Sequence, residues 1–373
     1  MAARAPRDEF VFVADERAAS LFAVASANAS LVVVAQRDSP TMAASAGGFR
    51  SPWDMMRLSR TMAGLGLDAI YFPSLYTYVP VLGRRPVVVT IHDAIPERFP
   101  ALTLPSARAR LFWALKRSMA LRQARIVVTV SEYAANELSA VLGLDRRRVR
   151  VVPEAPARVF SPSPDARVVE EGAERHGLAP GSRWFIYVGG IGPHKNVDAI
   201  IRAHAALVRG SPDQPVHLLL VGPSAGDVFL QDEASIRALV SREQTSHLVH
   251  WLGFVPDAEL RHLYTGAIAL LLVSKSEGFG LPAVEAAACR TPVVATKASP
   301  LPQLLEGGGI FVEPDDESAL CGAMRRLASD AALREQLGEG ARARASRLNW
   351  DTAADAALDA VHEAAVSPRA WAP

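Results

Sequence analysis

Short apolar runs without strict alternation of polar and apolar residues recur along this chain, and helical patterns separate them. In the first half these runs lie at residues 10–13, 31–34, 69–72, 87–91, 126–130 and 149–152, with helical patterns near 52–64, 105–122 and 132–143. Strands that are apolar on both faces are typical of parallel sheets covered by helices on each side. The sequence therefore predicts an α/β fold built on parallel sheets.

The length and the distribution of prolines predict two domains. A chain of 373 residues exceeds one ordinary domain, and four prolines fall between residues 153 and 164. A second series of strand and helix patterns follows at residues 184–327. The domain boundaries that we expect are listed here in chain order: a first domain at 1–160, a linker at 161–180, a second domain at 181–345 and a terminal helical segment at 346–373.

Charge and composition exclude several classes of protein. The formal net charge of +1 gives no global electrostatic basis for binding nucleic acid. Two cysteines, Cys289 and Cys321, do not make a disulfide framework, which fits a reducing compartment. The sequence has no uncharged apolar run of about 18 residues, and its first residues lack the apolar core of a signal peptide. We expect a cytoplasmic protein without a membrane span.

A glycine-bracketed turn at residues 274–286 joins a predicted strand to a predicted helix. Glu277 and Glu285 stand eight positions apart around this turn. The backbone N–H groups of Gly278, Phe279, Gly280 and Leu281 would lie at the helix N-terminus, where unpaired amides bind anions. The loop thus offers amides for a phosphate and carboxylates for hydroxyls, which suits a sugar nucleotide. Glycines at such turns also occur for turn geometry alone.

A second strand–glycine–helix segment lies at residues 184–197. Gly189 and Gly190 follow the predicted strand and would let the backbone approach a ligand closely. Lys195 could place a positive charge on a phosphate. The segment lacks the Gly-Lys-Ser/Thr of a phosphate-binding P-loop, and Lys195 occupies the place of the third glycine of a dinucleotide fingerprint.

In this order and spacing the two segments resemble the C-terminal half of GT-B glycosyltransferases, in particular retaining family 4 (glycosyl transferases group 1). The matching stretches are 187–189 with 195–196, 220–223, 252–256 with Leu260 and Tyr264, 276–282 with 285–286, and 291–295. The resemblance implies two Rossmann-like domains facing across a cleft. It also implies a C-terminal helix that crosses back onto the N-terminal domain.

The resemblance further implies the reaction and the role of each site residue. A hexose, mannose as our first choice, would move from a nucleoside diphosphate sugar to a glycan or lipid-linked acceptor, with retention and without a metal or other cofactor. The roles carried over by position are as follows: Gly189, Gly190 and Lys195 face the diphosphate; Glu277 and residues Gly278, Phe279, Gly280 and Leu281 hold the sugar and its phosphate; Glu285 accepts from the ribose; Val255 and Leu260 lie near the base; and His92 approaches from the other domain.

The sequence also departs from the family pattern. The run at residues 10–13 resembles the second strand of the family's N-terminal domain, so the usual first β-loop-α unit is expected to be missing. Gly190 stands where many members have arginine, Gln303 where glutamate is usual and Arg290 where glycine is usual. Without the first unit the acceptor side of the site would be incomplete, and without the arginine the diphosphate would meet one cation fewer.

The N-terminal half carries two further features that allow more than one interpretation. His92 and Asp93 follow a predicted strand, so His92 could contact the sugar, or both could only stabilise the loop. Residues 106–125 contain six basic residues and no acidic one, interleaved with apolar residues. This helix could lie peripherally on the inner face of the plasma membrane, or it could be an ordinary helix with a solvated basic face.

Two alternatives to the transferase remain open from the sequence. A catalytically silent GT-B protein could keep nucleotide binding and act as a partner in a polysaccharide assembly complex. A sugar-nucleotide epimerase shares the architecture and would need no acceptor loop.

Overall fold

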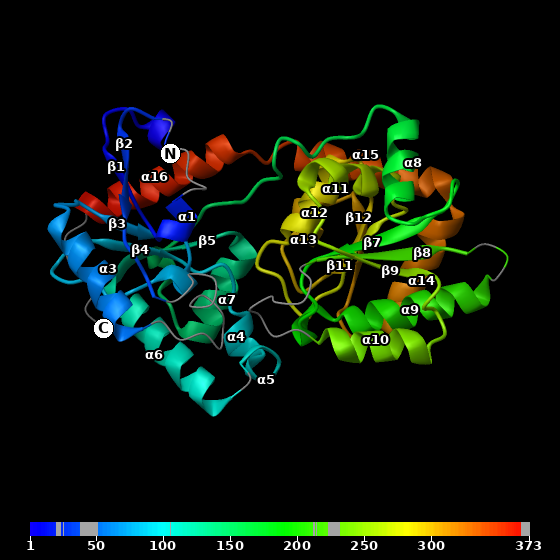
Figure 1. The fold of residues 1–373 in the computed structure, drawn as a ribbon, viewed down its shortest axis with the longest axis horizontal. Coiled ribbons are helices and arrows are strands. Elements are labelled where there is room, and N and C mark those ends of the chain that lie inside the picture. Colours follow the sequence, from blue (N-terminus) through cyan, green and yellow to red (C-terminus); the bar gives the residue numbers. More distant parts are fainter. Residues whose placement is uncertain are drawn as a thin grey trace. The chain divides into compact units, whose positions relative to one another are not determined.

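The computed structural model describes residues 1–19, 24, 26–37, 51–104, 106–211, 213, 215–222 and 232–366. The chain divides into two compact units (Figure 1). The first comprises Met1–Pro153 with Trp350–Pro373, and the second comprises Glu154–Asn349. Pro223 of the expected motif at 220–223, and the last seven residues of the expected terminal helix, lie outside the described residues.

The first unit contains two parallel sheets. Its strands are β1 (Phe10–Ala14), β2 (Ala29–Val33), β3 (Ile70–Phe72), β4 (Val87–Thr90), β5 (Ala124–Thr129) and β6 (Val149–Val151). Its α-helices are α1 (Glu16–Ala19), α3 (Pro52–Gly64), α4 (Ile95–Arg98), α5 (Pro100–Thr103), α6 (Ala107–Gln123), α7 (Glu132–Leu142) and α16 (Trp350–Val366). Strands β3 to β6 pair in chain order, while β1 pairs only with β2 among the described strands. The absence of a first β-loop-α unit stays a prediction.

One apolar core nevertheless unites the two sheets of the first unit. Val34, next to β2, is buried in the same cluster as Ile70 of β3 and Val89 of β4, and Leu58 and Met62 of α3 join it. Both sheets and α3 thus contribute side chains to one core.

Helix α16 packs against the sheet of the first unit, although it lies about 200 residues further along the chain than β6 (Figure 1). Its Ala360 and Ala364 form a buried cluster with Val88, Ile126 and Val128 of β4 and β5. Polar contacts reinforce this packing. Arg125 donates to the Ala364 carbonyl at 2.8 Å, Arg150 pairs with Glu363, and His362 lies 2.7 Å from Asp8.

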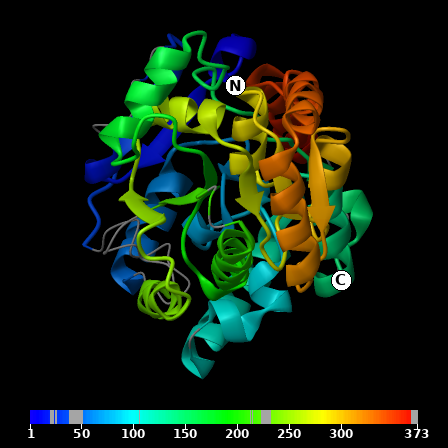
Figure 2. The same cartoon turned by 90° about the vertical axis from the view of Figure 1, so that its right-hand side faces the viewer.

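The second unit contains a six-stranded parallel sheet with helices on both faces (Figures 1 and 2). Its strands are β7 (Trp184–Val188), β8 (His217–Val221), β9 (Val249–Gly253), β10 (Leu270–Leu272), β11 (Val293–Thr296) and β12 (Gly309–Val312), in the order β12-β11-β10-β7-β8-β9. Its α-helices are α8 (Ala166–Arg175), α9 (Val197–Gly210), α10 (Glu233–Arg242), α11 (Asp257–Gly266), α12 (Leu281–Ala288), α13 (Leu301–Leu304), α14 (Glu317–Ser329) and α15 (Ala331–Ala345).

The strand order of this sheet reverses at β7. The chain proceeds from β7 through β8 to β9 on one side, then returns to place β10 on the other side of β7, where Leu270 lies opposite Ile186. Open α/β sheets bind ligands outside the carboxyl ends of the strands at such a switch point. The two glycine-containing segments predicted from the sequence follow β7 and β10, so both meet at this position.

The range 161–180, which we expected to be a linker, belongs to the second unit and contains helix α8. The Asp165 side chain caps this helix by accepting the Arg167 N–H at 2.8 Å. Gly172 and Ala173 are buried where α8 packs on α11. The prolines at 162 and 164 therefore precede a helix and do not form a linker. Proline is unfavourable inside a helix but is tolerated in the residues before its cap.

Candidate functional site

Glu277 is the buried centre of the candidate site. It follows β10, and only 8% of the residue is exposed. One carboxylate oxygen accepts from the Lys195 ammonium at 2.8 Å and from the Ser274 hydroxyl at 2.6 Å. Burial raises the pKa of Glu277, but Lys195, Ser274 and His194 together bring that pKa below its ordinary value. The carboxylate is therefore ionised and held in one orientation.

Lys195 is positioned by the turn that ends β7. It closes a short 3₁₀ turn, Pro193–Lys195, and Asn196 then adopts a left-handed conformation with φ of 60°. The Asn196 amide donates to the Val273 carbonyl at 3.0 Å and to the Pro314 carbonyl at 2.7 Å. Asn196 thus ties the loop after β7 to the end of β10, which brings Lys195 to Glu277.

Two glycines of this region are required by geometry. A Cβ on Gly222 would lie 2.2 Å from the carbonyl oxygen of Gly189, so the loops after β7 and β8 approach at van der Waals distance only because that Cβ is absent. Gly280 has φ of 91°, and a Cβ there would lie 2.9 Å from Leu301. Because glycine has no Cβ, the backbone can approach another backbone segment at Gly222 and a side chain at Gly280.

The loop from Gly278 to Leu281 leads into helix α12. Among the described residues, the N–H groups of Phe279, Gly280 and Leu281 form no backbone hydrogen bond. The next residue, Pro282, has no N–H to offer, and its place in the first turn is one that proline favours. The amide groups of Phe279, Gly280 and Leu281 are therefore without a backbone partner within the described ranges, beside the Lys195–Glu277 pair.

Glu285 lies in the second turn of α12 in an acidic setting. Burial and the charge of Asp257 raise the pKa of Glu285 to about 7, with a further contribution from Glu154, while a 3.3 Å hydrogen bond from the Tyr264 hydroxyl opposes them. Burial and Glu277 likewise raise the pKa of Glu154. Near neutral pH Glu285 is thus poised between the neutral and ionised forms.

The remaining predicted residues occupy two places. Val255 and Leu260 are buried at the end of β9 and in α11, whereas the neighbouring Phe254 is exposed. His92 follows β4 in the first unit, where burial lowers its pKa. The Asp93 carboxylate accepts the Ile95 N–H at 2.9 Å just before α4, a contact that fits the loop-stabilising interpretation. Contact between His92 and a ligand of the second unit stays a prediction.

Sequence reasoning missed two residues that interact with the carboxylates of the site. Ser274, three residues before Glu277 at the strand end, could have been noticed as a hydroxyl within reach. Nothing in the sequence indicates that Glu154 belongs to the site. More than 120 residues separate it from Glu277 and Glu285, and only the fold brings them near.

Metal-ligand clusters and membrane-spanning helices are both absent from the described residues. No group of three or more His, Cys, Asp or Glu side chains is placed to hold a metal ion. None of the helices in the described part of the chain is both long and apolar enough to cross a membrane.

The sequence matches two protein-family models. Residues 168–344 match "Glycosyl transferases group 1", and residues 4–155 match "Glycosyltransferase Family 4". The chain therefore belongs to this family of glycosyltransferases, as the motifs predicted.

Curated relatives agree with this assignment. The D-inositol 3-phosphate glycosyltransferase of Acidothermus cellulolyticus is 31% identical, covering 65% of this chain and 54% of the relative. The O-antigen chain mannosyltransferase B of Escherichia coli is 26% identical, covering 76% of this chain and 71% of the relative. The chain thus spans about half the length of the first of these relatives.

Solved structures share the fold. Sucrose-phosphate synthase from Thermosynechococcus elongatus superposes with a TM-score of 0.73 at 19% identity, covering 96% of this chain and 100% of that one. Anabaena HepE, in complex with UDP and glucose, superposes with a TM-score of 0.69 at 20% identity, covering 90% of this chain and 86% of that one. Together with the family match, these likenesses confirm the GT-B fold of two Rossmann-like domains.

Proposed function

We propose that this protein is a retaining, metal-independent glycosyltransferase that moves a hexose from a nucleoside diphosphate sugar to an acceptor. The observation that carries the proposal is the convergence of the Lys195–Glu277 pair and the amides of residues 279–281 at the switch point of the second sheet. A cation and amide donors next to a sugar-binding carboxylate suit a sugar diphosphate.

Each group has a distinct task in this mechanism. Lys195 and the loop amides stabilise the negative charge that develops on the leaving diphosphate, which is electrostatic stabilisation by preorganised donors. Glu277, ionised and fixed by Ser274, accepts hydrogen bonds from hydroxyls of the transferred sugar. Glu285 accepts from the ribose. The leaving phosphate takes the proton of the acceptor hydroxyl, so no protein nucleophile is required.

The activities of similar proteins support a hexose donor and a glycan or lipid-linked acceptor in cell-surface polysaccharide or glycolipid synthesis. One relative is a mannosyltransferase of an O-antigen chain, and one structural neighbour holds UDP and glucose. We propose mannose as the first donor to test, with glucose as the second.

Helix α6 supports peripheral contact with the cytoplasmic face of the plasma membrane, though through fewer charges than the sequence suggested. Lys116 donates to the Tyr76 carbonyl at 2.6 Å, and Arg117 pairs with Glu97 at 2.9 Å. Arg108 and Arg122 remain on the exposed face of the helix. The exposed face also carries Leu111, Phe112 and Leu115, which are 68%, 44% and 52% exposed.

A donor-hydrolysis screen over UDP- and GDP-sugars tests the proposal. We expect slow release of the nucleoside diphosphate from one donor, and loss of that release in Glu277→Gln. An exposed glutamate of α8 provides the control variant, Glu174→Gln, which should behave as the wild type. Donor binding without hydrolysis or transfer would favour the silent partner protein, and a changed sugar in the recovered nucleotide would favour the epimerase.

A further inference from the structure

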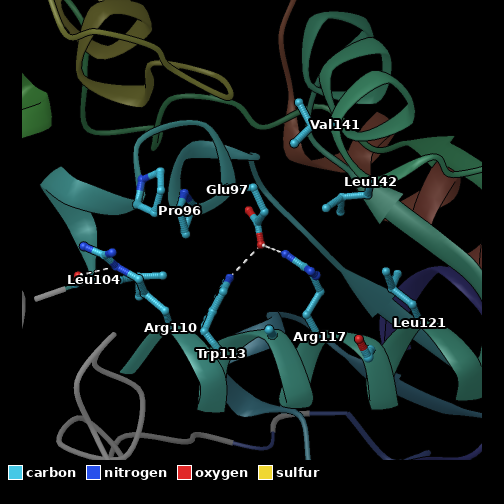
Figure 3. Close-up of a pocket in the computed structure, with 12 residues that line it drawn as sticks. Pro96, Glu97, Leu104, Arg110, Trp113, Arg117, Leu121, Val141 and Leu142 are labelled. Atoms are coloured by element: carbon cyan, nitrogen blue, oxygen red, sulfur yellow. Dashed lines mark hydrogen bonds and ion pairs between the residues drawn. The ribbon is translucent and has the colours of Figure 1, made fainter. Parts of the chain in front are cut away.

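The geometry of the first unit points to a lipid-binding site: the pocket beside α6 takes the apolar chain of an anionic membrane lipid, with its phosphate at Arg110. We call this cavity the α6 pocket. It has a volume of about 450 Å³ and lies between α6, the α4–α5 segment and the end of α7 (Figure 3). Pockets of several hundred Å³ with apolar walls and few polar groups are typical of small-molecule sites.

The walls of the α6 pocket come from one stripe of α6 and from residues facing it. Arg110, Trp113, Arg117 and Leu121 recur at helical spacing and therefore share that stripe. Opposite them stand apolar residues of the α5 and α7 regions, which include Leu104 and Leu142. Polar and apolar surfaces contribute almost equally to the walls, so the cavity offers partners for both the chain and the head group of one lipid.

Its polar groups leave one positive charge unbalanced. The Glu97 carboxylate accepts from the Trp113 indole N–H at 2.6 Å and from Arg117 at 2.9 Å (Figure 3). Arg110 donates only to the Leu104 carbonyl, at 3.4 Å, and no acidic side chain of the described residues forms an ion pair with it. Two arginines and one glutamate give the lining a net charge of +1.

The surface next to the pocket identifies the occupant as a membrane lipid. Leu111 and Leu115 lie on the solvent-facing side of the same helix, with Arg108 and Arg122 beside them. Residues 107–123 contain five basic residues and no acidic one. A helix with exposed leucines among basic side chains is complementary to the surface of an anionic bilayer. A lipid of that bilayer could enter the adjoining pocket, and Arg110 would meet its phosphate.

This inference is independent of the donor chemistry. It uses no residue of the second unit, and its test measures binding without any sugar donor. It also differs from the proposed membrane contact, because a monomeric lipid can fill the pocket when no bilayer is present. Failure here would leave the transferase proposal standing, and the reverse also holds.

Calorimetry with monomeric monoacylglycerol phosphates of six and eight carbons per chain tests the site. Each methylene that enters the pocket should tighten binding about fourfold, the equivalent of about 0.8 kcal/mol. Inorganic phosphate and the neutral eight-carbon monoacylglycerol serve as the head-only and chain-only arms. Both should bind at least tenfold more weakly than the eight-carbon phosphate.

Four variants separate the pocket from the helix surface. Ala114→Phe and Ser118→Phe place a ring in the cavity and should abolish the dependence on chain length. Two such variants are used so that misfolding of one, seen in its thermal unfolding, does not decide the result. Arg110→Gln should remove the preference for the phosphate over the neutral lipid. Arg108→Gln, on the same helix outside the pocket, is the matched control and should bind as the wild type.

Several results would overturn the proposal. The affinity could be the same for six and eight carbons per chain, or inorganic phosphate could bind as tightly as the lipid. A folded pocket-filling variant could also bind the lipid as tightly as the wild type does. An equal loss in Arg108→Gln and Arg110→Gln would show a diffuse surface charge effect in place of a site.

Discussion

Replacing Glu285 by glutamine should make the second unit more stable and the site less able to bind nucleotide. Burial, with the charges of Asp257 and Glu154, raises the pKa of Glu285 from 4.5 to about 7. At roughly 1.36 kcal/mol per pH unit, this difference corresponds to about 3 kcal/mol of free energy that ionisation costs the folded state. Glutamine carries no charge and can still accept from the Tyr264 hydroxyl, so it avoids this cost.

The sign of the effect depends on pH. Between pH 4.5 and 7 the folded protein holds a proton on Glu285 that the unfolded chain has already released, so the free energy of unfolding falls as pH rises. Below pH 4.5 both states are protonated, and Glu285→Gln should leave stability unchanged. Above pH 7 the variant should be more stable by up to about 3 kcal/mol.

Urea unfolding of both proteins at pH 4, 6 and 8 gives this comparison. Hydrogen exchange of the β7 amides assigns the transition to the second unit. A stability difference between the two proteins that is the same at all three pH values would refute the reasoning, because the ionisation of Glu285 could not then be its cause.

Glu285→Ala should weaken binding of a nucleoside diphosphate by about 1.5–3 kcal/mol, the range for a hydrogen bond to a charged group. An unchanged dissociation constant would remove Glu285 from the ribose site.

Three further outcomes follow from the structure. Lys195→Ala should weaken binding of a nucleoside diphosphate far more than binding of the nucleoside alone, and calorimetry giving equal losses would make Lys195 purely structural. Gly280→Ala should destabilise the second unit by about 1–3 kcal/mol because the backbone of Gly280 is left-handed. Gly322→Ala lies in the interior of α14 with open space around it and should stabilise the unit by about 0.5–1 kcal/mol. A thermal unfolding temperature of Gly280→Ala at or above that of Gly322→Ala would contradict the left-handed conformation of Gly280. Removing the charges of Arg108 and Arg122 together should release the protein from anionic vesicles. Equal co-sedimentation with anionic and neutral vesicles would show that α6 is an ordinary helix with a solvated basic face.

Features that depend on neighbouring residues were predictable from the sequence. Ser131 caps α7 by accepting the Ala134 N–H at 3.0 Å, as expected of a serine between a strand and a helix. Asp316 caps α14 in the same way, through the Ala319 N–H at 2.8 Å. The loops around Lys195 and Glu277 were also found, because glycines between an apolar run and a helical pattern mark a strand-to-helix turn.

Features that depend on distant residues were not predictable in this way. Burial is the main cause of the raised Glu285 pKa, with the charges of Asp257 and Glu154 adding to it, and no local pattern indicates that the fold brings these groups together. Residues 106–125 contain six basic residues, but only the fold shows that Lys116 donates to the Tyr76 carbonyl and that Arg117 pairs with Glu97. Charge counted along a helix therefore overstates the charge that a surface partner would meet.

The packing of α16 on the first unit has a consequence for synthesis of the chain. A ribosome releases the N-terminal strands first, but the buried cluster of Val88, Ile126 and Val128 is completed only by Ala360 and Ala364. The second unit, Glu154–Asn349, is a single continuous segment and can complete its core while α16 is still being made. The first unit therefore finishes folding last, and until then one apolar face of its sheet is open to chaperones and to aggregation.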